Sequence, residues 1–555
     1  LVPTAPATYH ARVAPRRTHL VLHDQGEQKR SRRDPGAMQM TEPKRFFIAV
    51  GAVLMALAVS PAVADPWAKP GDLALRHDIQ LLADAGIIKS PVTTWPIPWG
   101  TLAADLAANG DCPGDCPHLR PAEQAALARL QSRLDTVRGL RGLQPNARIA
   151  ARTDDGIWLR TFEDTPRDDL EARVGVSWMG DRFAARAQVA YANDPRPGDR
   201  EWRGDGSYLA GIFANQIVYA GALDRWWGPG HSDSLILSSN SRPVSALGLE
   251  RNIARPFETR WLSWLGPWNY SLVWGFLESG RDVPNARLTA FRFNFRPTEN
   301  LEIGLSRAGQ WCGEGRPCDF GTFTDLVLGR DNRGDDGLTE DTEPGNQLAA
   351  VDFRWRSPFL RQPWAIYGQA VAEDEAGGLP SLWFGQLGAE AWGEIDAGWL
   401  SGRWRAHLEY SNTLAGFYKD EKRYDTAYEH SIYTSGYRYY SRTLGAGLDG
   451  DSKVLSAGVT LVDRNEHTWH ALVRAGTLNE LGDGAGRDAI HSAAPEETKI
   501  FSAQLSHRRD LQYNGVKLGT VSAGFGLQSA DNEVTGESET DAQVFLQWTW
   551  DYSGL

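Results

Sequence analysis

The sequence predicts an all-β transmembrane barrel of about 16 to 18 antiparallel strands, preceded by a short helical region on the periplasmic side or in the lumen. From about Ala150 to the end of the chain, apolar residues recur with a period of two, which is typical of strands with one apolar and one polar face. The chain also has 22 Trp, more than a soluble protein of this size needs. We expect their rings to form two girdles at the level of the lipid headgroups.

The alternation is clearest in five segments. In the segment 171–178, Ala172, Val174, Val176 and Trp178 alternate with polar or small residues; the other four segments are 183–191, Phe291–Phe295, Val351–Trp355 and Trp404–Tyr410. A strand with its turn takes roughly 20–25 residues in such barrels, which sets the expected strand number. Polar, acidic stretches interrupt the pattern and are expected as surface loops: Gly329–Gly345, Glu480–Glu497 and Ser529–Asp541.

The residues before the barrel divide into leader and helices. No stretch reaches the roughly 20 apolar residues of a membrane-spanning helix, and the longest, Phe46–Val59, follows Lys44 and Arg45. This order predicts a secretory signal peptide cleaved after Ala64. We therefore expect residues 1–39 to be an upstream extension or leader, 40–64 the signal peptide, 65–148 a helical periplasmic or plug region, and 149–555 the barrel. Apolar spacing of three and four from Leu73 to Leu143 predicts the helices.

Charge and cysteine content exclude some partners. Without residues 1–64 the chain has 49 basic and 66 acidic residues, a net charge of −17, so nucleic acid is not an expected partner. In an oxidising compartment, the close pairs Cys112 with Cys116 and Cys312 with Cys318 predict two local disulfides. A zinc site is the alternative, but the pairs lie about 200 residues apart and no histidine pair accompanies them. We expect no metal and no cofactor.

One segment combines adjacent indole rings with planar polar side chains. Asp224–Gly230 contains Arg225, Trp226 and Trp227, and Ser234–Pro243 follows with Asn240 and Arg242. Sugars stack on aromatic rings, and guanidinium and amide groups bind hydroxyl or carboxylate groups. A girdle pair followed by a Gly-Pro turn explains the composition equally well.

The same segment resembles the signature of the Wzi family of capsule assembly proteins. Arg225–Gly230 is similar to its Trp-Trp-Gly-Pro-Gly motif, and Ser234–Pro243 to the Ser-Leu-Ile-Leu-Ser continuation. Two more blocks resemble the family, one from Asp65 through Arg76–Ile88 to Trp99 and one from Tyr428 to Ser452. The sequence departs from the pattern at Ser241, at Ala446 and at its end, Tyr552–Leu555, which lacks a terminal aromatic residue. We expect Trp548, Trp550 and Tyr552 to serve in its place.

This resemblance implies an outer-membrane lectin of about eighteen strands with helices at its periplasmic side. Its partners would be capsular or extracellular polysaccharide, outer-membrane lipid and the polysaccharide export machinery. The expected binding residues are Arg225, Trp226, Trp227, Asn240, Arg242, Tyr437, Arg438 and Arg442. Because the sequence does not fix their side of the membrane, some of them are alternatively structural residues of the lumen.

Other functions are weighed against this one. A porin or saccharide-specific channel would also suit inward arginine and acidic residues. The fragments Gly230–Ser234 and Gly450–Ser452 resemble hydrolase motifs, but a catalytic triad is assembled from separate elements and needs an oxyanion hole. The loop Asp331–Gly337 has the oxygen density of a calcium loop without its twelfth-position Glu, which favours a solvated loop. We therefore expect no enzyme activity.

Overall fold

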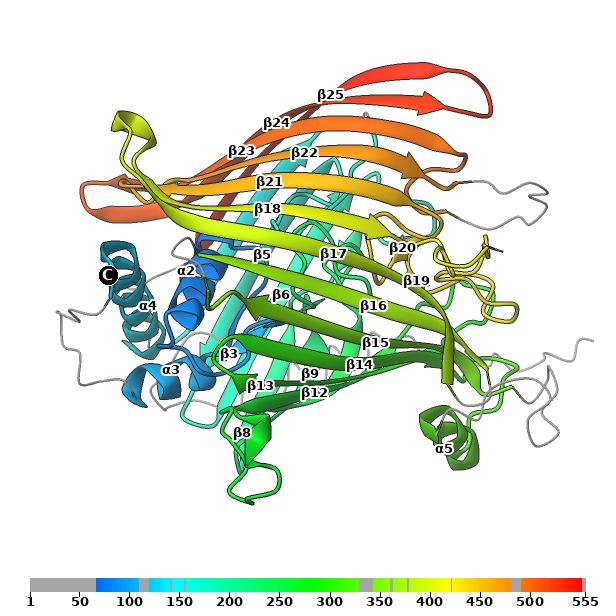
Figure 1. Cartoon of the computed structure of the whole chain (residues 1–555), viewed down its shortest axis with the longest axis horizontal. Coiled ribbons are helices and arrows are strands. Elements are labelled where there is room, and N and C mark those ends of the chain that lie inside the picture. The colour runs from blue at the N-terminus through cyan, green and yellow to red at the C-terminus, as the bar shows by residue number, and fades with distance from the viewer. Residues whose placement is uncertain are drawn as a thin grey trace, which may run out of the picture. The chain divides into compact units, whose positions relative to one another are not determined.

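The chain forms a closed antiparallel barrel in which neighbouring strands follow one another in sequence (Figure 1). The computed structural model describes residues 66–108, 119–139, 142–153, 156–328, 343–359, 363–376, 379–420, 422–480 and 491–551. Within these residues the barrel has 18 long strands, because the two-residue β7 (Trp202–Arg203) only adds to β6, which also pairs directly with β8. The predicted fold class and the upper end of the predicted strand number are thus confirmed.

The barrel strands are β4 (Gln144–Arg152), β5 (Leu170–Met179), β6 (Phe183–Asn193), β8 (Tyr208–Phe213), β9 (Gln216–Ala222), β11 (Ser245–Arg251), β12 (Trp268–Phe276), β13 (Arg287–Thr298), β14 (Leu301–Trp311), β15 (Gly345–Arg356), β16 (Trp364–Ala376), β17 (Leu379–Ile395), β18 (Gly402–Asn412), β21 (Lys453–Asp463), β22 (Thr468–Leu478), β23 (Thr498–Tyr513), β24 (Val516–Asn532) and β25 (Ser538–Asp551). The barrel closes where β25 pairs with β4, Trp548 opposite Ile149 and Trp550 opposite Ala147. The closing strand thus carries the two described aromatic residues expected there.

The barrel wall is polar inside and apolar outside. On β13, Arg292 and Asn294 are buried in the lumen, whereas Phe291 is exposed on the outer surface. On β18, Glu409 is buried and Leu408 is exposed. Because successive side chains of a strand point to opposite faces, the alternation seen in the sequence becomes a lipid-facing surface and a polar lumen.

The tryptophan residues do not all serve as girdles. Trp261 and Trp264 are exposed in the connection between β11 and β12, as expected at a membrane interface. Six others are almost fully buried: Trp67, Trp95, Trp226, Trp227, Trp311 and Trp392. The girdle prediction is therefore wrong for these six, because most of them pack within the barrel against the N-terminal segment and the loops that fold inward.

The two ends of the barrel differ. At the short-turn end the strand connections are mostly tight, such as Ala214–Asn215 between β8 and β9 and Asn514–Gly515 between β23 and β24. At the long-loop end lie the connections 223–244, 312–344 and 413–452. Outer-membrane barrels have short periplasmic turns and longer extracellular loops, so the short-turn end faces the periplasm.

The N-terminal segment carries α2 (Leu73–Asp84), α3 (Trp99–Ala108) and α4 (Pro121–Gly139) at the short-turn end, opposite α5 (Phe320–Leu328) (Figure 1). Two small sheets accompany it: β1 (Trp67–Ala68) pairs with β3 (Ile97–Pro98), and β2 (Thr94–Trp95) pairs with β10 (Trp226–Trp227). No helix among the described residues is long and apolar enough to cross a membrane. The barrel starts at Gln144, five residues before the boundary taken from the sequence.

The loop prediction for Ser529–Asp541 is wrong over most of its length. β24 continues to Asn532 and β25 begins at Ser538, so only the turn between them is left. Residues 533–540 of this hairpin are all exposed, so the apolar alternation by which strands were recognised is absent there. The stretches 329–342 and 481–490, with the calcium-like loop, lie outside the described residues.

Candidate functional site

The lumen is filled at the short-turn end by the N-terminal segment, which buried carboxylates of α2 attach to the wall. Asp84 lies 2.7 and 3.0 Å from the two terminal nitrogens of Arg354 on β15 and 3.3 Å from Nη2 of Arg405 on β18. Asp78 lies 3.0 Å from Nε of Arg403, also on β18. Paired guanidinium and carboxylate groups form the strongest hydrogen bonds in proteins. They fix α2 inside the barrel.

Trp226 and Trp227 join this plug to the loop 223–244, which folds inward from the long-loop end. As β10 they pair with Trp95 and Thr94 respectively. The Trp226 indole donates to the carbonyl of Gly230 at 3.0 Å, and its ring meets Phe162 edge-on with 5.5 Å between centroids. Both Trp226 and Trp227 are 1% exposed. Neither ring therefore has a free face on which a sugar could stack in this structure.

The polar residues of the same loop are also engaged by the protein. Arg225 donates to a tyrosine hydroxyl of β9 at 2.7 Å. Asn240 donates to the carbonyl of Thr443 at 3.0 Å. Arg242 makes a bidentate pair with Asp205 at 2.8 and 2.9 Å. All three are buried and hold the loop in place.

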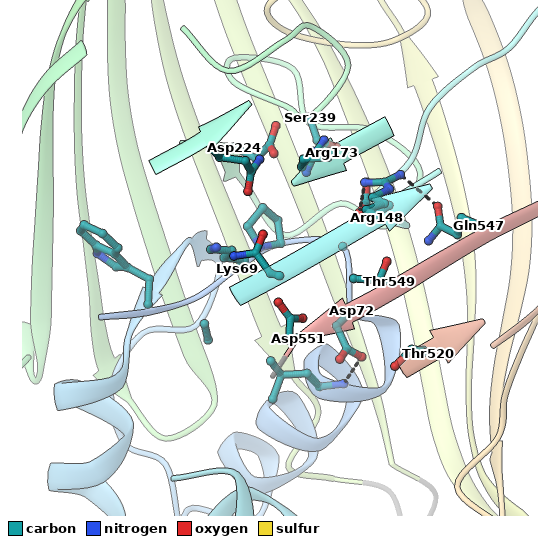
Figure 2. A pocket seen from close by; sticks show the side chains of 18 of the residues that line it. Lys69, Asp72, Arg148, Arg173, Asp224, Ser239, Thr520, Gln547, Thr549 and Asp551 are labelled. Carbon is teal, nitrogen blue, oxygen red and sulfur yellow. Dashed lines mark hydrogen bonds and ion pairs between the residues drawn. The ribbon is translucent and has the colours of Figure 1, made fainter. Parts of the chain in front are cut away.

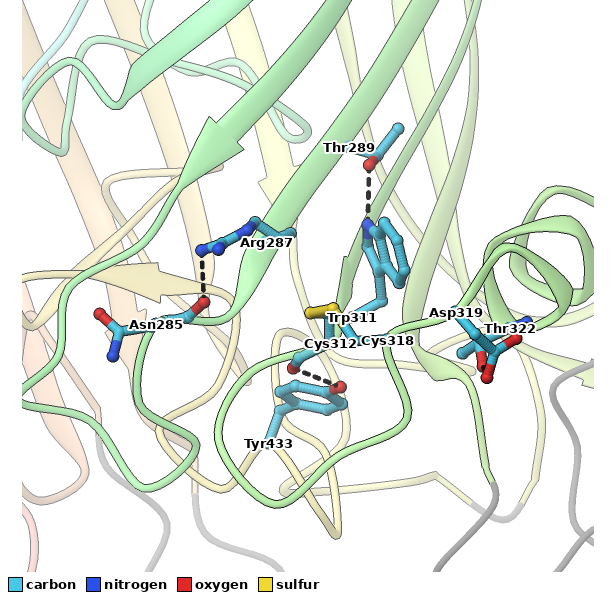
Figure 3. Close-up of a disulfide and its surroundings, with 9 residues drawn as sticks. All are labelled: Asn285, Arg287, Thr289, Trp311, Cys312, Cys318, Asp319, Thr322 and Tyr433. Atoms are coloured by element: carbon cyan, nitrogen blue, oxygen red, sulfur yellow. Dashed lines mark hydrogen bonds between the residues drawn. A yellow bond between two sulfur atoms is a disulfide. The ribbon is translucent and has the colours of Figure 1, made fainter.

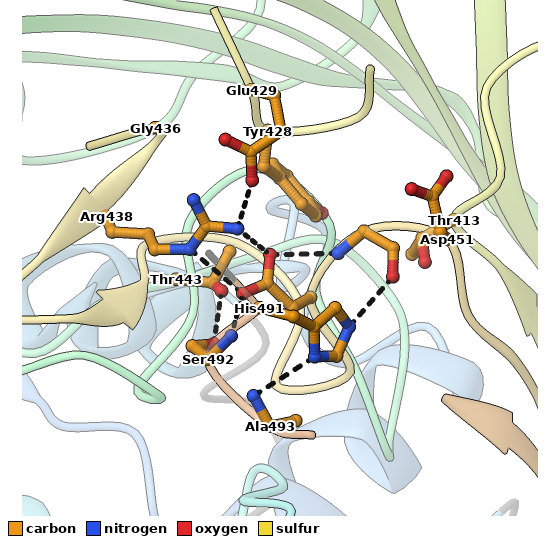
Figure 4. Close-up of polar contacts among 12 residues, drawn as sticks. Thr413, Tyr428, Glu429, Gly436, Arg438, Thr443, Asp451, His491, Ser492 and Ala493 are labelled. Atoms are coloured by element: carbon orange, nitrogen blue, oxygen red, sulfur yellow. Dashed lines mark hydrogen bonds and ion pairs between the residues drawn. The ribbon is translucent and has the colours of Figure 1, made fainter. Parts of the chain in front are cut away.

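Arg438 lies at the centre of an ion-pair cluster in the loop 413–452 (Figure 4). It donates from Nε and Nη2 to the two oxygens of Asp449 at 2.9 and 2.8 Å and also pairs with Glu429. Asp449 in turn accepts from the backbone nitrogen of Ser492 at 2.6 Å. The cluster connects the loop 413–452 to the connection between β22 and β23.

Tyr437 and Arg442 extend the same loop toward other parts of the chain. The hydroxyl of Tyr437 donates to the carbonyl of Ile236 at 2.9 Å, and Arg442 donates to the carbonyl of Arg167 at 2.6 Å. The eight residues expected from the sequence are thus brought into one loop network, but as buried supports. This placement matches the alternative in which they are structural residues of the lumen.

Burial perturbs two acidic groups of the Arg438 cluster. Burial raises the pKa of Asp451 from 3.8 to about 8 and that of Glu429 from 4.5 to about 7. Burial alone would also raise the pKa of Asp449, but the guanidinium of Arg438 holds it below its usual value. Near neutral pH, the side chain of Asp451 therefore keeps its proton whereas Asp449 stays ionised.

The two hydrolase-like fragments do not form a catalytic arrangement. The Oγ of Ser452 lies 3.4 Å from Nε2 of His491, but Nδ1 of that histidine accepts from the backbone nitrogens of Ala493 and Ala494 at 3.3 and 2.9 Å. Nε2 therefore carries the proton and cannot take one from the serine. Ser452 and Ser232 are at most 1% exposed, so no substrate reaches either hydroxyl.

The disulfide Cys312–Cys318 predicted from the sequence is present at the start of the connection 312–344 (Figure 3). The carbonyl of Cys312 accepts from the hydroxyl of Tyr433 at 3.1 Å, so the disulfide loop is attached to the loop 413–452. The other expected pair, Cys112 with Cys116, lies outside the described residues.

A cavity of about 380 Å³ lies between the N-terminal segment and the inner wall formed by β4, β5, β6, β24 and β25 (Figure 2). Seven basic and four acidic residues line it, together with nine Ser, Thr, Asn or Gln residues and the rings of Trp67, Trp99 and Phe162. Its lining reaches Pro145 and Asp551, at the short-turn end. This composition suits a polar, anionic ligand of small size.

The sequence did not point to this cavity. Arg173 is one of the polar residues that alternate with apolar ones in the segment 171–178, but the residues opposite it, on β4 and in the N-terminal segment, belong to separate stretches of sequence. Period-two arginine residues in the first strands were the available signal. This pattern shows which face of each strand is polar, but it does not show which residues lie close together in the folded barrel.

Comparison with known proteins supports the fold and shows the family. The capsule assembly protein Wzi family model matches residues 148–542. An uncharacterized 55.8 kDa protein from the cps region of Klebsiella pneumoniae is 29% identical over 513 residues, covering 91% of this chain and 94% of that protein. The solved structure of Wzi, an outer-membrane carbohydrate-binding barrel involved in group 1 capsule assembly in Escherichia coli, has a TM-score of 0.71 and 26% identity, covering 89% of this chain and all of that one. This chain is an outer-membrane β-barrel and belongs to the Wzi family of capsule assembly proteins.

Proposed function

We propose that this protein binds capsular or extracellular polysaccharide at the cell surface and holds it there without covalent chemistry. One observation carries the proposal. Two long loops, 223–244 and 413–452, fold into the long-loop mouth and are locked together by buried contacts such as Tyr437 with Ile236 and Asn240 with Thr443. Locked loops present a fixed polar surface, and preorganisation of this kind lowers the entropic cost of binding a long, flexible glycan.

Exposed side chains of the locked loop 413–452 offer contacts for a glycan. Tyr418 is 53% exposed, and the ammonium group of Lys419 lies 5.8 Å from the centre of its ring. An aromatic ring next to a cation can stack on a sugar and attract an acidic substituent. The buried residues Arg438 and Arg442 would then support binding indirectly, by holding this loop.

A porin-like role is the alternative that the plug argues against. The ion pairs of Asp84 and Asp78 with wall arginine residues would have to break before a solute could pass the short-turn end. For the same reason we propose that the export machinery contacts the outside of the protein and that no polysaccharide chain is threaded through the lumen.

Retention of surface polysaccharide tests the proposal. Cells lacking the gene should shed polysaccharide into the medium, and wild-type protein should restore the cell-bound fraction. Tyr418→Ala and Arg438→Ala should restore less than half of the cell-bound fraction. Trp261→Ala, a change of an exposed residue at the short-turn end, should restore it fully. Heat-modifiable migration in gels verifies that each barrel is folded. Unchanged retention in the deletion strain would overturn the proposal.

A further inference from the structure

The cavity at the short-turn end contains two arginine residues that face each other. Arg148 of β4 and Arg173 of β5 are directly opposite in the strand register, and both line the cavity. Like charges in directly opposed positions destabilise a sheet. The carboxylates of Asp164 and Glu171 lie within 4.0 Å of Arg148 and pair with it, so Arg173 is the less satisfied of the two arginine residues.

The two guanidinium groups differ in what they already bind. Arg148 lies 2.7 Å from Asp164 and 3.0 Å from the Gln547 side-chain oxygen. Arg173 makes no hydrogen bond and no close ion pair with any described residue, although the carboxylates of Asp164, Glu171 and Asp224 attract its charge, and its side chain is partly exposed toward the cavity (Figure 2). The donors of Arg148 are either engaged or, at Nε, buried. The guanidinium donors of Arg173 are therefore the ones available to an additional acceptor.

The rest of the lining indicates what kind of molecule carries that acceptor. The seven basic residues outnumber the four acidic ones, so the cavity favours an anion. Amide and hydroxyl groups, among them Asn146, Gln188 and Thr549, can pair with several hydroxyl groups of one ligand. The volume of about 380 Å³ falls within the roughly 300–1,000 Å³ of small-ligand sites.

We propose that this cavity binds a uronate-bearing saccharide of one or two sugar residues, with its carboxylate on Arg173. A carboxylate matches the planar fork of a guanidinium group, and the sugar hydroxyls take the amide and hydroxyl positions. The site faces the periplasm, at the opposite end from the surface that holds polysaccharide. The site would therefore bind saccharide on the periplasmic side, separately from the attachment of polysaccharide at the cell surface.

Calorimetry on the full-length protein in detergent tests the proposal, with digalacturonate as the probe and maltose as the neutral disaccharide of the same length. Wild type should bind digalacturonate at least tenfold more tightly than maltose. Arg173→Gln should lose at least tenfold in affinity for digalacturonate, and Arg173→Lys, which keeps the charge without the planar fork, should lie between the two. Arg182→Gln, an exposed change in the turn between β5 and β6, is the matched control.

Thermal melting provides a second measurement that does not depend on detecting weak binding. Without ligand, Arg173→Gln should melt near the wild-type temperature, because the change removes the repulsion from Arg148 together with the attraction of Asp164, Glu171 and Asp224. Digalacturonate should raise the melting temperature of wild type and not of Arg173→Gln.

Equal affinity of wild type and Arg173→Gln for digalacturonate would overturn the proposal, as would equal affinity of wild type for digalacturonate and maltose. Tighter binding of inorganic phosphate than of digalacturonate would identify the cavity as a phosphate site and would overturn the proposal of a saccharide ligand. Retention of surface polysaccharide is tested in a separate experiment on the opposite end of the barrel. The proposed function and the proposed saccharide site can therefore fail independently.

Discussion

Removing the carboxylate of Asp84 should release α2 from the barrel wall. Asp84 is 4% exposed and pairs with Arg354 and Arg405, which also share Glu390 at 2.6 and 2.7 Å. In Asp84→Ala the two guanidinium groups keep a single carboxylate, so one buried positive charge is left without a partner. Losing one member of a buried ion pair costs about 3–5 kcal/mol. The open state of the plug should therefore become roughly 100-fold to 4,000-fold more populated.

Hydrogen exchange of the α2 amides measures this opening directly, because exchange from a locally opened segment reports its free energy. Asp84→Ala should exchange faster by the factor given, and Asp84→Asn, which keeps the shape and the acceptor oxygen, should show a smaller effect. Asp135→Ala, an exposed change on α4, is the control. If α2 in Asp84→Ala exchanges at the wild-type rate, the ion pairs do not hold the plug.

Three further predictions concern the loop network and its attachments. The pKa of Asp451 is raised from 3.8 to about 8, so the folded protein retains a proton that the unfolded chain loses. The contribution of Asp451 to stability therefore falls as pH rises from about 4 to 8. Asp451→Asn should flatten the decline in melting temperature between pH 6 and pH 8.5. Phe162→Ala removes the ring whose centroid lies 5.2 and 5.5 Å from those of Trp95 and Trp226. It should lower the free energy of unfolding, measured with a chemical denaturant, by about 3–5 kcal/mol. A loss below about 1 kcal/mol would contradict the importance of this aromatic contact. Cys318→Ser should cost roughly 2 kcal/mol locally, seen as faster proteolysis near α5 while the barrel stays heat-modifiable.

The barrel strands could be predicted because the membrane imposes a strict pattern on them. Lipid requires an apolar residue at every second position and the lumen accepts polar ones, as Phe291 and Arg292 show on β13. Where a strand leaves the membrane this pattern ends, which is why the hairpin of β24 and β25 was mistaken for a loop. The signal thus depends on the solvent at each face and not on the strand itself.

The loop network could not be predicted in the same way. Trp226 and Trp227 have a local sequence that suits sugar binding, a membrane girdle or a buried junction equally. Their partner strand, Thr94–Trp95, lies more than 130 residues earlier in the chain, and nothing in either segment specifies the pairing. The family resemblance pointed to these residues and left their role open, and the structure shows them buried within the loop network.

Buried ion pairs contribute to the closure of both ends of the lumen, and this limits how a polymer can be bound. At the short-turn end, ionised groups such as Asp84 and Arg354 are buried and only weakly screened by salt. At the long-loop end, the ion pairs of Arg438 with Asp449 and of Arg242 with Asp205 accompany neutral contacts such as that of Tyr437 with Ile236. Because these pairs are buried as well, added salt is not expected to release either closure. The proposals above accordingly place a long glycan outside the barrel and a short saccharide in the basic cavity beside the plug.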